Sequence, residues 1–209
     1  MPNTCYVQVN HPKFACDQAL NIWVDKFDLR TDDSLKIIFF TNTIHSFNGI
    51  NPNIVIDFKS YNYVELNVVG YFSRVIHFSN ANNYEECMQC LLDLFINSWA
   101  KQSMVGISYA DIIAVLSESK LGIIESVDNV KFLSGHCKKA TVKNDFLKDY
   151  RLTSLLCIYR EYDPRLEDFG NYGIAIDGLA NKDTLVVVGL LPVKKSIDKQ
   201  NSVIYYGLS

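Results

Sequence analysis

The chain has 209 residues, of which 48% are hydrophobic and 21% are charged, and its formal net charge at neutral pH is -3. This composition is typical of a globular protein with one large domain or two small ones. The small negative charge argues against a nucleic-acid partner, because nucleic-acid-binding proteins usually carry a basic face. The apolar runs are too short to cross a membrane and the first residues do not resemble a signal peptide, so we expect a cytoplasmic protein.

Residues 1–82 predict a small α/β region. Apolar residues recur at helical spacing across residues 14–27, which indicates a helix. Runs rich in β-branched and aromatic residues then predict about four strands, at residues 35–40, 54–58, 64–69 and 71–78. This part of the chain resembles no family that we recognise.

A long connecting helix is predicted for residues 83–104. Apolar side chains recur every three or four residues from Tyr84 to Trp99, which gives the helix a wide apolar face. Asn82 or Asn83 can cap its start, because a short side-chain oxygen accepts hydrogen bonds from the free backbone N–H groups of the first turn.

Cys87 and Cys90 form a C-x-x-C pair on this predicted helix. The two alternatives are a metal or redox site and a pair of thiols packed in the core. No second Cys or His pair stands at a matching spacing, so the packed alternative is favoured and no metal is expected. The six scattered cysteines are expected to be reduced, since a chain of this length can build its own core.

Residues 105–209 predict a second domain in which helices and strands alternate. Ser108 precedes a helical pattern that runs from Tyr109 to Leu116, and residues 129–147 predict a weakly patterned helix. Buried-type strands are predicted at residues 120–125, 152–159, 185–191 and 202–206.

A polar stretch rich in carboxylates separates two of these strands. If Asp163 caps a helix there, Pro164 falls at the first helical position, where its missing N–H costs nothing. Glu167 and Asp168 then lie in the first turns, where the helix dipole favours negative charge. Further along, Gly173 would allow this helix to approach a strand closely.

The same carboxylates, together with Arg165, have an alternative interpretation as a catalytic site. No nucleophile, base or set of metal ligands converges with them in the sequence. The adjacent pair His136 and Cys137 carries no accompanying oxyanion motif. We therefore expect the carboxylates to begin a helix, and we do not expect an enzyme.

Several of these segments, taken in order, resemble the C-terminal domain of the FtsZ family of tubulin-related proteins. The similar segments are residues 105–115, 162–169, 183–189 and 203–208. The resemblance implies an α/β fold in which a C-terminal mixed β-sheet flanked by helices is joined by the long helix to a smaller N-terminal α/β region. We expect these two regions to contain two separate sheets.

The sequence departs from the FtsZ family at the nucleotide site. Members of the family bind GTP through a glycine-rich loop, since only glycine lets backbone N–H groups close around phosphate oxygens. The sequence contains no such loop and no alternative phosphate-binding motif. We therefore expect no GTP binding and no cofactor.

A second departure concerns the family's synergy loop, which reaches into the nucleotide pocket of the next filament subunit. The family's Asn corresponds to Gly106 and its first Asp to Ser108, while its second Asp is retained as Asp111. The resemblance implies that Gly106, Ser108, Tyr109 and Asp111 form a partner-binding loop that promotes hydrolysis poorly, because neutral Ser108 lacks the charge of a carboxylate.

Two functional hypotheses follow from the resemblance. The first is a non-GTPase interaction protein that binds or caps filaments of FtsZ or another tubulin-like protein and modulates their assembly in cell division. The alternative is a structural scaffold that associates with itself without nucleotide, since head-to-tail contacts between identical chains build rings or filaments.

Overall fold

In the computed structural model the described residues fall into eight segments: 5–10, 35–41, 53–60, 62–98, 105–133, 150–162, 165–193 and 201–209. The helix predicted at residues 14–27 and most of the helix predicted at residues 129–147 lie outside these segments.

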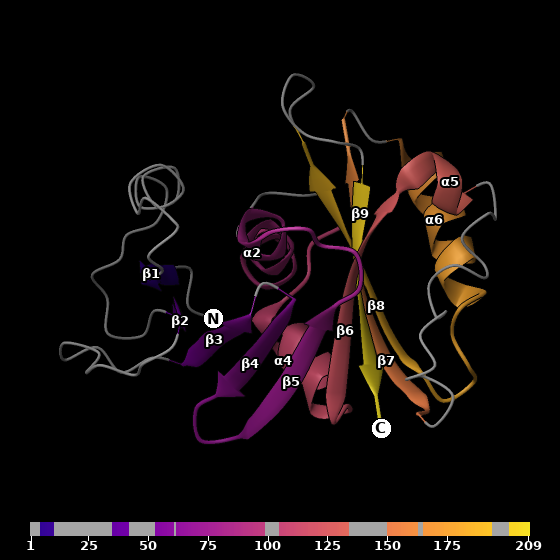
Figure 1. Cartoon of the computed structure of the whole chain (residues 1–209). Helices are drawn as coiled ribbons and strands as arrows, with labels where there is room; N and C mark the ends of the chain where they lie inside the picture. Colours follow the sequence, from indigo (N-terminus) through magenta and orange to yellow (C-terminus); the bar gives the residue numbers. More distant parts are fainter. Residues whose placement is uncertain are drawn as a thin grey trace.

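The described strands form one nine-stranded mixed sheet with the order β1-β2-β3-β4-β5-β6-β9-β7-β8 (Figure 1). The strands are β1 (Cys5–Asn10), β2 (Leu35–Thr41), β3 (Ile54–Ser60), β4 (Tyr63–Val68), β5 (Phe72–Phe78), β6 (Leu121–Asp128), β7 (Leu152–Glu161), β8 (Leu185–Pro192) and β9 (Asn201–Leu208). Every strand predicted from the sequence is present. Strand β1 was not predicted, although Val7 and Val9 alternate with Gln8 and Asn10 in the period of a strand.

The prediction of an α/β fold with a mixed sheet flanked by helices is confirmed, but the prediction of two separate sheets was wrong. Strand β5 pairs in parallel with β6, and Val75 lies opposite Leu121. The hydrogen-bonded sheet therefore continues across the boundary predicted at residue 83. A parallel pair needs a long crossover, and the predicted connecting helix is part of that crossover.

The helices are α2 (Tyr84–Leu92), the π-helical turn η1 (Asp93–Asn97), α4 (Tyr109–Ser117), α5 (Asn129–Leu133) and α6 (Leu166–Asp177). Asn83 caps α2, because its side-chain oxygen accepts a hydrogen bond from the Glu86 backbone N–H at 2.9 Å. The connecting helix is described as far as Ser98, and it widens into the π-helical turn at Asp93. Its remaining predicted residues lie outside the described segments.

Helix α6 begins later than the sequence predicted. Arg165 is at the N-cap position without a side-chain hydrogen bond, so the prediction that Asp163 caps the helix and that Pro164 is its first residue was wrong. Strand β7 remains paired with β8 as far as Glu161, and the helix begins at Leu166. Asp163 and Pro164 themselves lie outside the described segments. Glu167 and Asp168 do occupy the first turn, as predicted.

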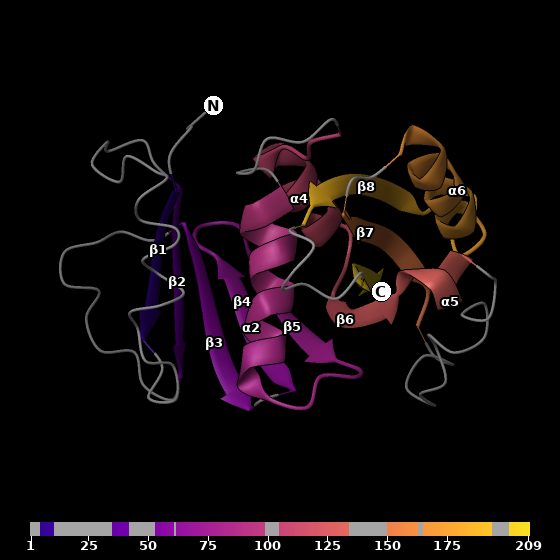
Figure 2. The ribbon, with the colours of Figure 1, turned by 90° about the horizontal axis from the view of Figure 1, so that it is seen from above.

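Helices cover both faces of the sheet around β6, β9, β7 and β8 (Figures 1 and 2). Helix α2, η1 and α4 pack on one face, where they share a core with Leu156, Ile158 and Tyr205. Helices α5 and α6 pack on the other face, where Tyr172 of α6 contacts Tyr159 with ring centroids 4.8 Å apart. The continuous apolar run of β7 is explained by this double cover.

Candidate partner-binding site

The loop before α4 is fixed to the edge of the sheet at β8. The Val105 carbonyl accepts a hydrogen bond from the Leu190 N–H at 3.1 Å, and the Ile107 N–H donates to the Ser98 carbonyl at 3.4 Å. The Ile107 side chain lies against Gly189, where an added Cβ would be 2.5 Å from the Ile107 Cδ1 atom. Position 189 therefore has to be glycine for the loop to lie this close to the strand.

Ser108 and Asp111 form a capping box at the start of α4. The Ser108 Oγ accepts a hydrogen bond from the Asp111 N–H at 3.2 Å, and the Asp111 Oδ2 accepts from the Ser108 N–H at 2.8 Å. The predicted helix start at Ser108 is thus confirmed. Because the Ser108 hydroxyl also donates to the same Asp111 oxygen at 2.7 Å, this carboxylate is turned toward its own loop.

Gly106 and Tyr109 are the other two residues predicted for partner binding. They lie before and after Ser108 in the chain. Gly106 is exposed, and a Cβ added there would meet no heavy atom within 4 Å. Tyr109 is half-buried and packs against the core. Burial raises the pKa of Tyr109, and the phenol of Tyr71 raises it further.

Tyr71 belongs to the turn that joins β4 to β5. Its side chain is 81% exposed, and Val69 in the same turn is 46% exposed. Gly70 between them has a φ of 83°, a conformation that glycine adopts without strain in a three-residue hairpin loop. The sequence analysis placed Tyr71 in a strand, although the glycine between two alternating runs was a signal for this turn.

Arg74 connects this hairpin to α4. Its Nε donates to the Leu116 carbonyl at 3.1 Å and its Nη2 donates to the Ser117 carbonyl at 3.3 Å. The guanidinium carbon also lies 4.4 Å from the centre of the Phe72 ring. A cation is favourable at a helix C-terminus, where carbonyl groups are left without helical partners. Arg74 therefore ties the start of β5 to the C-terminal end of α4.

We group four residues of the loop and the hairpin under the name loop–hairpin surface: Val69, Tyr71, Gly106 and Tyr109. The sequence predicted the two residues of the loop and missed the two of the hairpin. Ser108 and Asp111, which were also predicted for partner binding, hold the loop in place through the capping box. The surface offers exposed apolar and aromatic groups on a fixed backbone.

The other candidate residues occupy separate places in the fold. Cys87 and Cys90 are buried on α2, and burial is the main cause that raises the pKa of each thiol to about 12. Both therefore stay protonated, a form that binds metals poorly. Within the described segments, no three or more His, Cys, Asp or Glu side chains are grouped to hold a metal ion. His136 and Cys137 fall outside those segments.

None of the helices in the part of the chain that the structure describes is both long and apolar enough to span a membrane. No family model matches the chain, and no curated protein matches it in sequence. Among solved structures, the chain is similar to a tryptophan-to-tyrosine mutant of FtsZ from M. jannaschii, with 14% sequence identity and a TM-score of 0.43. The match covers 59% of this chain and 37% of that FtsZ chain, and it amounts to a distant structural similarity.

Proposed function

We propose that this protein binds a subunit of an FtsZ-like or tubulin-like filament through the loop–hairpin surface and so modulates filament assembly in cell division, without hydrolysing GTP. The observation that carries the proposal is the exposed ring of Tyr71, whose phenol acts electrostatically on Tyr109 at the end of this loop. In sequence this loop resembles the FtsZ loop that reaches the neighbouring subunit.

The anchoring of the loop supports a role in binding. A loop that is already fixed loses little conformational freedom when a partner docks on it, so less of the interaction free energy is lost to ordering. Val105 and Ile107 provide this fixation on β8, and the capping box of Ser108 provides it on α4.

The chemistry of the surface also suits a protein partner. Tyrosine is enriched in interface hot spots, because its ring buries a large area and its hydroxyl can still find a hydrogen-bond partner. Tyr71 leaves most of its ring in solvent, and Val69 extends the apolar area next to it. Burial of these groups by a partner would remove apolar surface from water.

The resemblance also favours binding over catalysis. The position that corresponds to the family's first Asp is Ser108, which carries no charge. The retained Asp111 accepts its hydrogen bonds from the loop itself. A contact made by this loop would therefore occupy the end of a filament without supplying the carboxylates that promote hydrolysis.

A sedimentation assay tests the proposal. Purified bacterial FtsZ is polymerised with GTP in the presence of increasing amounts of this protein, and the pelleted FtsZ and the released phosphate are measured. We expect an equimolar amount to change the pelleted fraction. The protein alone is expected to release no phosphate.

Two variants assign the effect to the loop–hairpin surface. Gly106→Arg adds a bulky side chain where an added Cβ meets no atom, so it should leave the fold intact, and Tyr71→Ser removes the exposed ring. Both are expected to abolish the effect on FtsZ. The control is Ile174→Ser, which removes a side chain that is 72% exposed on α6, across the sheet from α4 (Figure 1).

The assay also separates the alternatives. Indifference of FtsZ pelleting to an equimolar amount of the protein would reject filament binding. Light scattering of the protein alone distinguishes the scaffold hypothesis, because a mass that grows with concentration would indicate self-association. An effect on FtsZ that Gly106→Arg and Tyr71→Ser retain would move the contact away from this surface.

A further inference from the structure

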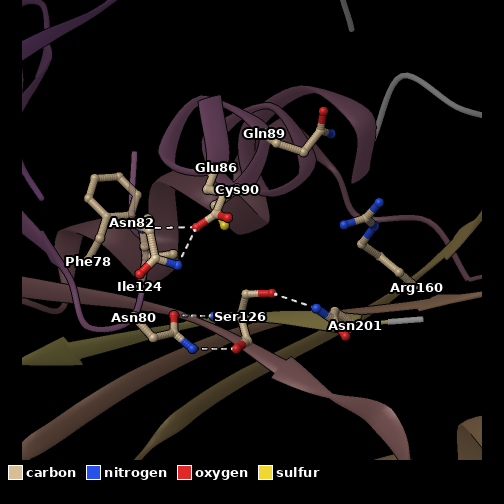
Figure 3. Close-up of a pocket in the computed structure, with 11 residues that line it drawn as sticks. Phe78, Asn80, Asn82, Glu86, Gln89, Cys90, Ile124, Ser126, Arg160 and Asn201 are labelled. Atoms are coloured by element: carbon tan, nitrogen blue, oxygen red, sulfur yellow. Dashed lines mark hydrogen bonds between the residues drawn. The ribbon is translucent and has the colours of Figure 1, made fainter. Parts of the chain in front are cut away.

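A polar pocket of about 380 Å³ lies between α2 and the ends of β5, β6 and β7 (Figure 3). Its lining residues are Phe78, Asn80, Ala81, Asn82, Glu86, Gln89, Cys90, Ile124, Ser126, Arg160 and Asn201. This volume is within the range of small-molecule sites. The carboxyl ends of parallel strands are also the usual place for ligands in open α/β sheets.

The lower wall of the pocket is held by side-chain hydrogen bonds to Ser126. Beyond the end of β5, the Asn80 side chain accepts from the Ser126 N–H at 3.1 Å and donates to the Ser126 carbonyl at 2.6 Å. The Asn201 Nδ2 donates to the Ser126 Oγ at 3.4 Å. These bonds keep three of the polar side chains in place, so the wall exists before any ligand binds.

Glu86 provides a carboxylate on the opposite wall. Its Oε2 accepts hydrogen bonds from the Asn82 backbone N–H at 2.9 Å and from the Asn82 Nδ2 at 3.1 Å. The second carboxylate oxygen lies beside Cys90 in the view of Figure 3. Among the described segments, no hydrogen bond reaches this second oxygen, so it can accept a bond from a ligand.

Arg160 is the other charged residue among the described residues that line the pocket, and it forms an ion pair with buried Asp93. Its Nη1 lies 3.2 Å from the Asp93 Oδ2, and the two side chains are 10% and 1% exposed. The Asp93 Oδ1 also accepts from the Gln89 Nε2 at 2.9 Å and from the Asn97 Nδ2 at 2.6 Å. Because Asp93 neutralises Arg160, the carboxylate of Glu86 gives the described pocket residues their net negative charge.

Burial raises the pKa of Cys90 most, and the Asp93 carboxylate raises it further, while Arg160 opposes them. A π-helical turn begins at Asp93, and such turns are frequent at functional sites. Because Arg160 is paired with Asp93, the Glu86 carboxylate disfavours phosphate and carboxylate ligands in the pocket.

We infer that this pocket binds a small aliphatic ligand that carries an ammonium group, with the ammonium held by the Glu86 carboxylate. The aliphatic part lies against Phe78 and Ile124, and a hydroxyl or amide at its far end meets the amide and hydroxyl groups of Ser126 and Asn201. This inference does not depend on the proposed filament binding, because the pocket and the loop–hairpin surface share no residue.

A titration followed by nuclear magnetic resonance tests the inference on the full chain. The probes are a five-carbon amino alcohol, the diol of the same length and the hydroxy acid of the same length, which differ only in one end group. We expect the amino alcohol to shift the amide signals of Glu86 and Ser126, with a dissociation constant on the order of 1 mM for so small a ligand. The diol and the hydroxy acid are expected to bind at least about tenfold more weakly.

Two matched variants assign the ammonium contact. Glu86→Gln keeps the size of the side chain and an oxygen for Asn82 but removes the charge, so it is expected to weaken amino alcohol binding at least about tenfold. Glu85→Gln removes the same charge one residue earlier, outside the lining, and should leave binding unchanged. Circular dichroism checks that both variants fold.

Three outcomes would overturn the inference. They are equal or tighter binding of the diol or the hydroxy acid, unchanged binding by Glu86→Gln, and no signal shift with the amino alcohol up to about ten times the expected dissociation constant. None of these outcomes bears on the effect on FtsZ, so the two proposals fail separately.

Discussion

Strands β4 and β7 belong to the same sheet but lie in different environments. In β7 every residue from Ser154 to Arg160 is buried, because helices pack on both faces. In β4 burial alternates, with Val64 and Leu66 buried and Glu65 and Asn67 exposed. The comparison shows that the sheet is covered on both faces at β7, whereas at β4 one face stays polar and exposed.

The largest expected effect comes from placing a charge in each of these two strands. Cys157→Asp puts a carboxylate at a fully buried position of β7, which should cost about 4 kcal/mol of unfolding free energy or more and can prevent folding. Asn67→Asp makes the matched change at an exposed position of β4 and should stay within about 0.5 kcal/mol of wild type. Urea denaturation measures both. Similar costs at the two sites would contradict the described difference in cover.

A smaller effect is expected from a substitution at Gly207, a crowded position on the strand next to β7. In Gly207→Ala of β9 the new Cβ would be 2.1 Å from the Ser154 Oγ and 2.9 Å from the Ser119 Cβ. We expect a loss of about 1–3 kcal/mol of unfolding free energy, because neighbouring strands and the end of α4 would have to move apart.

The matched change on the opposite face should have the opposite sign. Gly173 was predicted to permit a close approach of its helix to a strand, but a Cβ added there meets no atom within 4 Å, so that prediction was wrong. Gly173→Ala should therefore raise the unfolding free energy by about 0.5–1 kcal/mol through better helix propensity. Thermal denaturation of both variants gives the two signs, and a loss of stability in Gly173→Ala would show that α6 packs more tightly than described.

The smallest expected effect is a pH dependence at β6, which lies between β4 and β7 in the sheet. Burial raises the pKa of Glu125 from 4.5 to about 7, against the opposing effect of a hydrogen bond with Tyr206. The folded state therefore binds this proton more tightly than the unfolded state does. The contribution of Glu125 to the unfolding free energy should be fully present below pH 4.5 and should be lost as the pH rises to about 7.

The size of this effect is moderate, because Glu125 is only half-buried and water screens part of its charge. We expect a change of about 1 kcal/mol across this pH range. Urea denaturation at several pH values measures it, and Glu125→Gln should remove the fall. An equal fall in the variant would assign the pH dependence to other groups.

The part of the loop–hairpin surface whose structure depends on neighbouring residues in the chain could be predicted from the sequence. The capping box of Ser108 and Asp111 depends on residues three apart, and the sequence indicated the helix start correctly. The contribution of Tyr71 depends on its electrostatic effect on Tyr109, thirty-eight positions away in the numbering of the chain. No local pattern encodes an interaction over that separation, so the hairpin half of the surface was missed.

The charged stretch before α6 is a place where local sequence rules for helix starts failed. Asp163 and Pro164 match a favoured helix start by residue type, but Arg165 occupies the N-cap position. Pairing of β7 with β8 also extends the strand to Glu161, past its predicted end at residue 159, and this pairing is not local in the sequence.

Apart from β1, the sequence by itself determined the type and order of the described strands and of α2, α4 and α6, because hydrophobic periodicity reflects which side chains each element buries. It also determined the caps of α2 and α4, which need only neighbouring residues. The tertiary structure alone decided that β5 joins β6 in one sheet, that Gly189 receives Ile107, and that Asp93 neutralises Arg160 beside the pocket. Each of these depends on packing between segments far apart in the chain, and no spacing along the sequence records such packing.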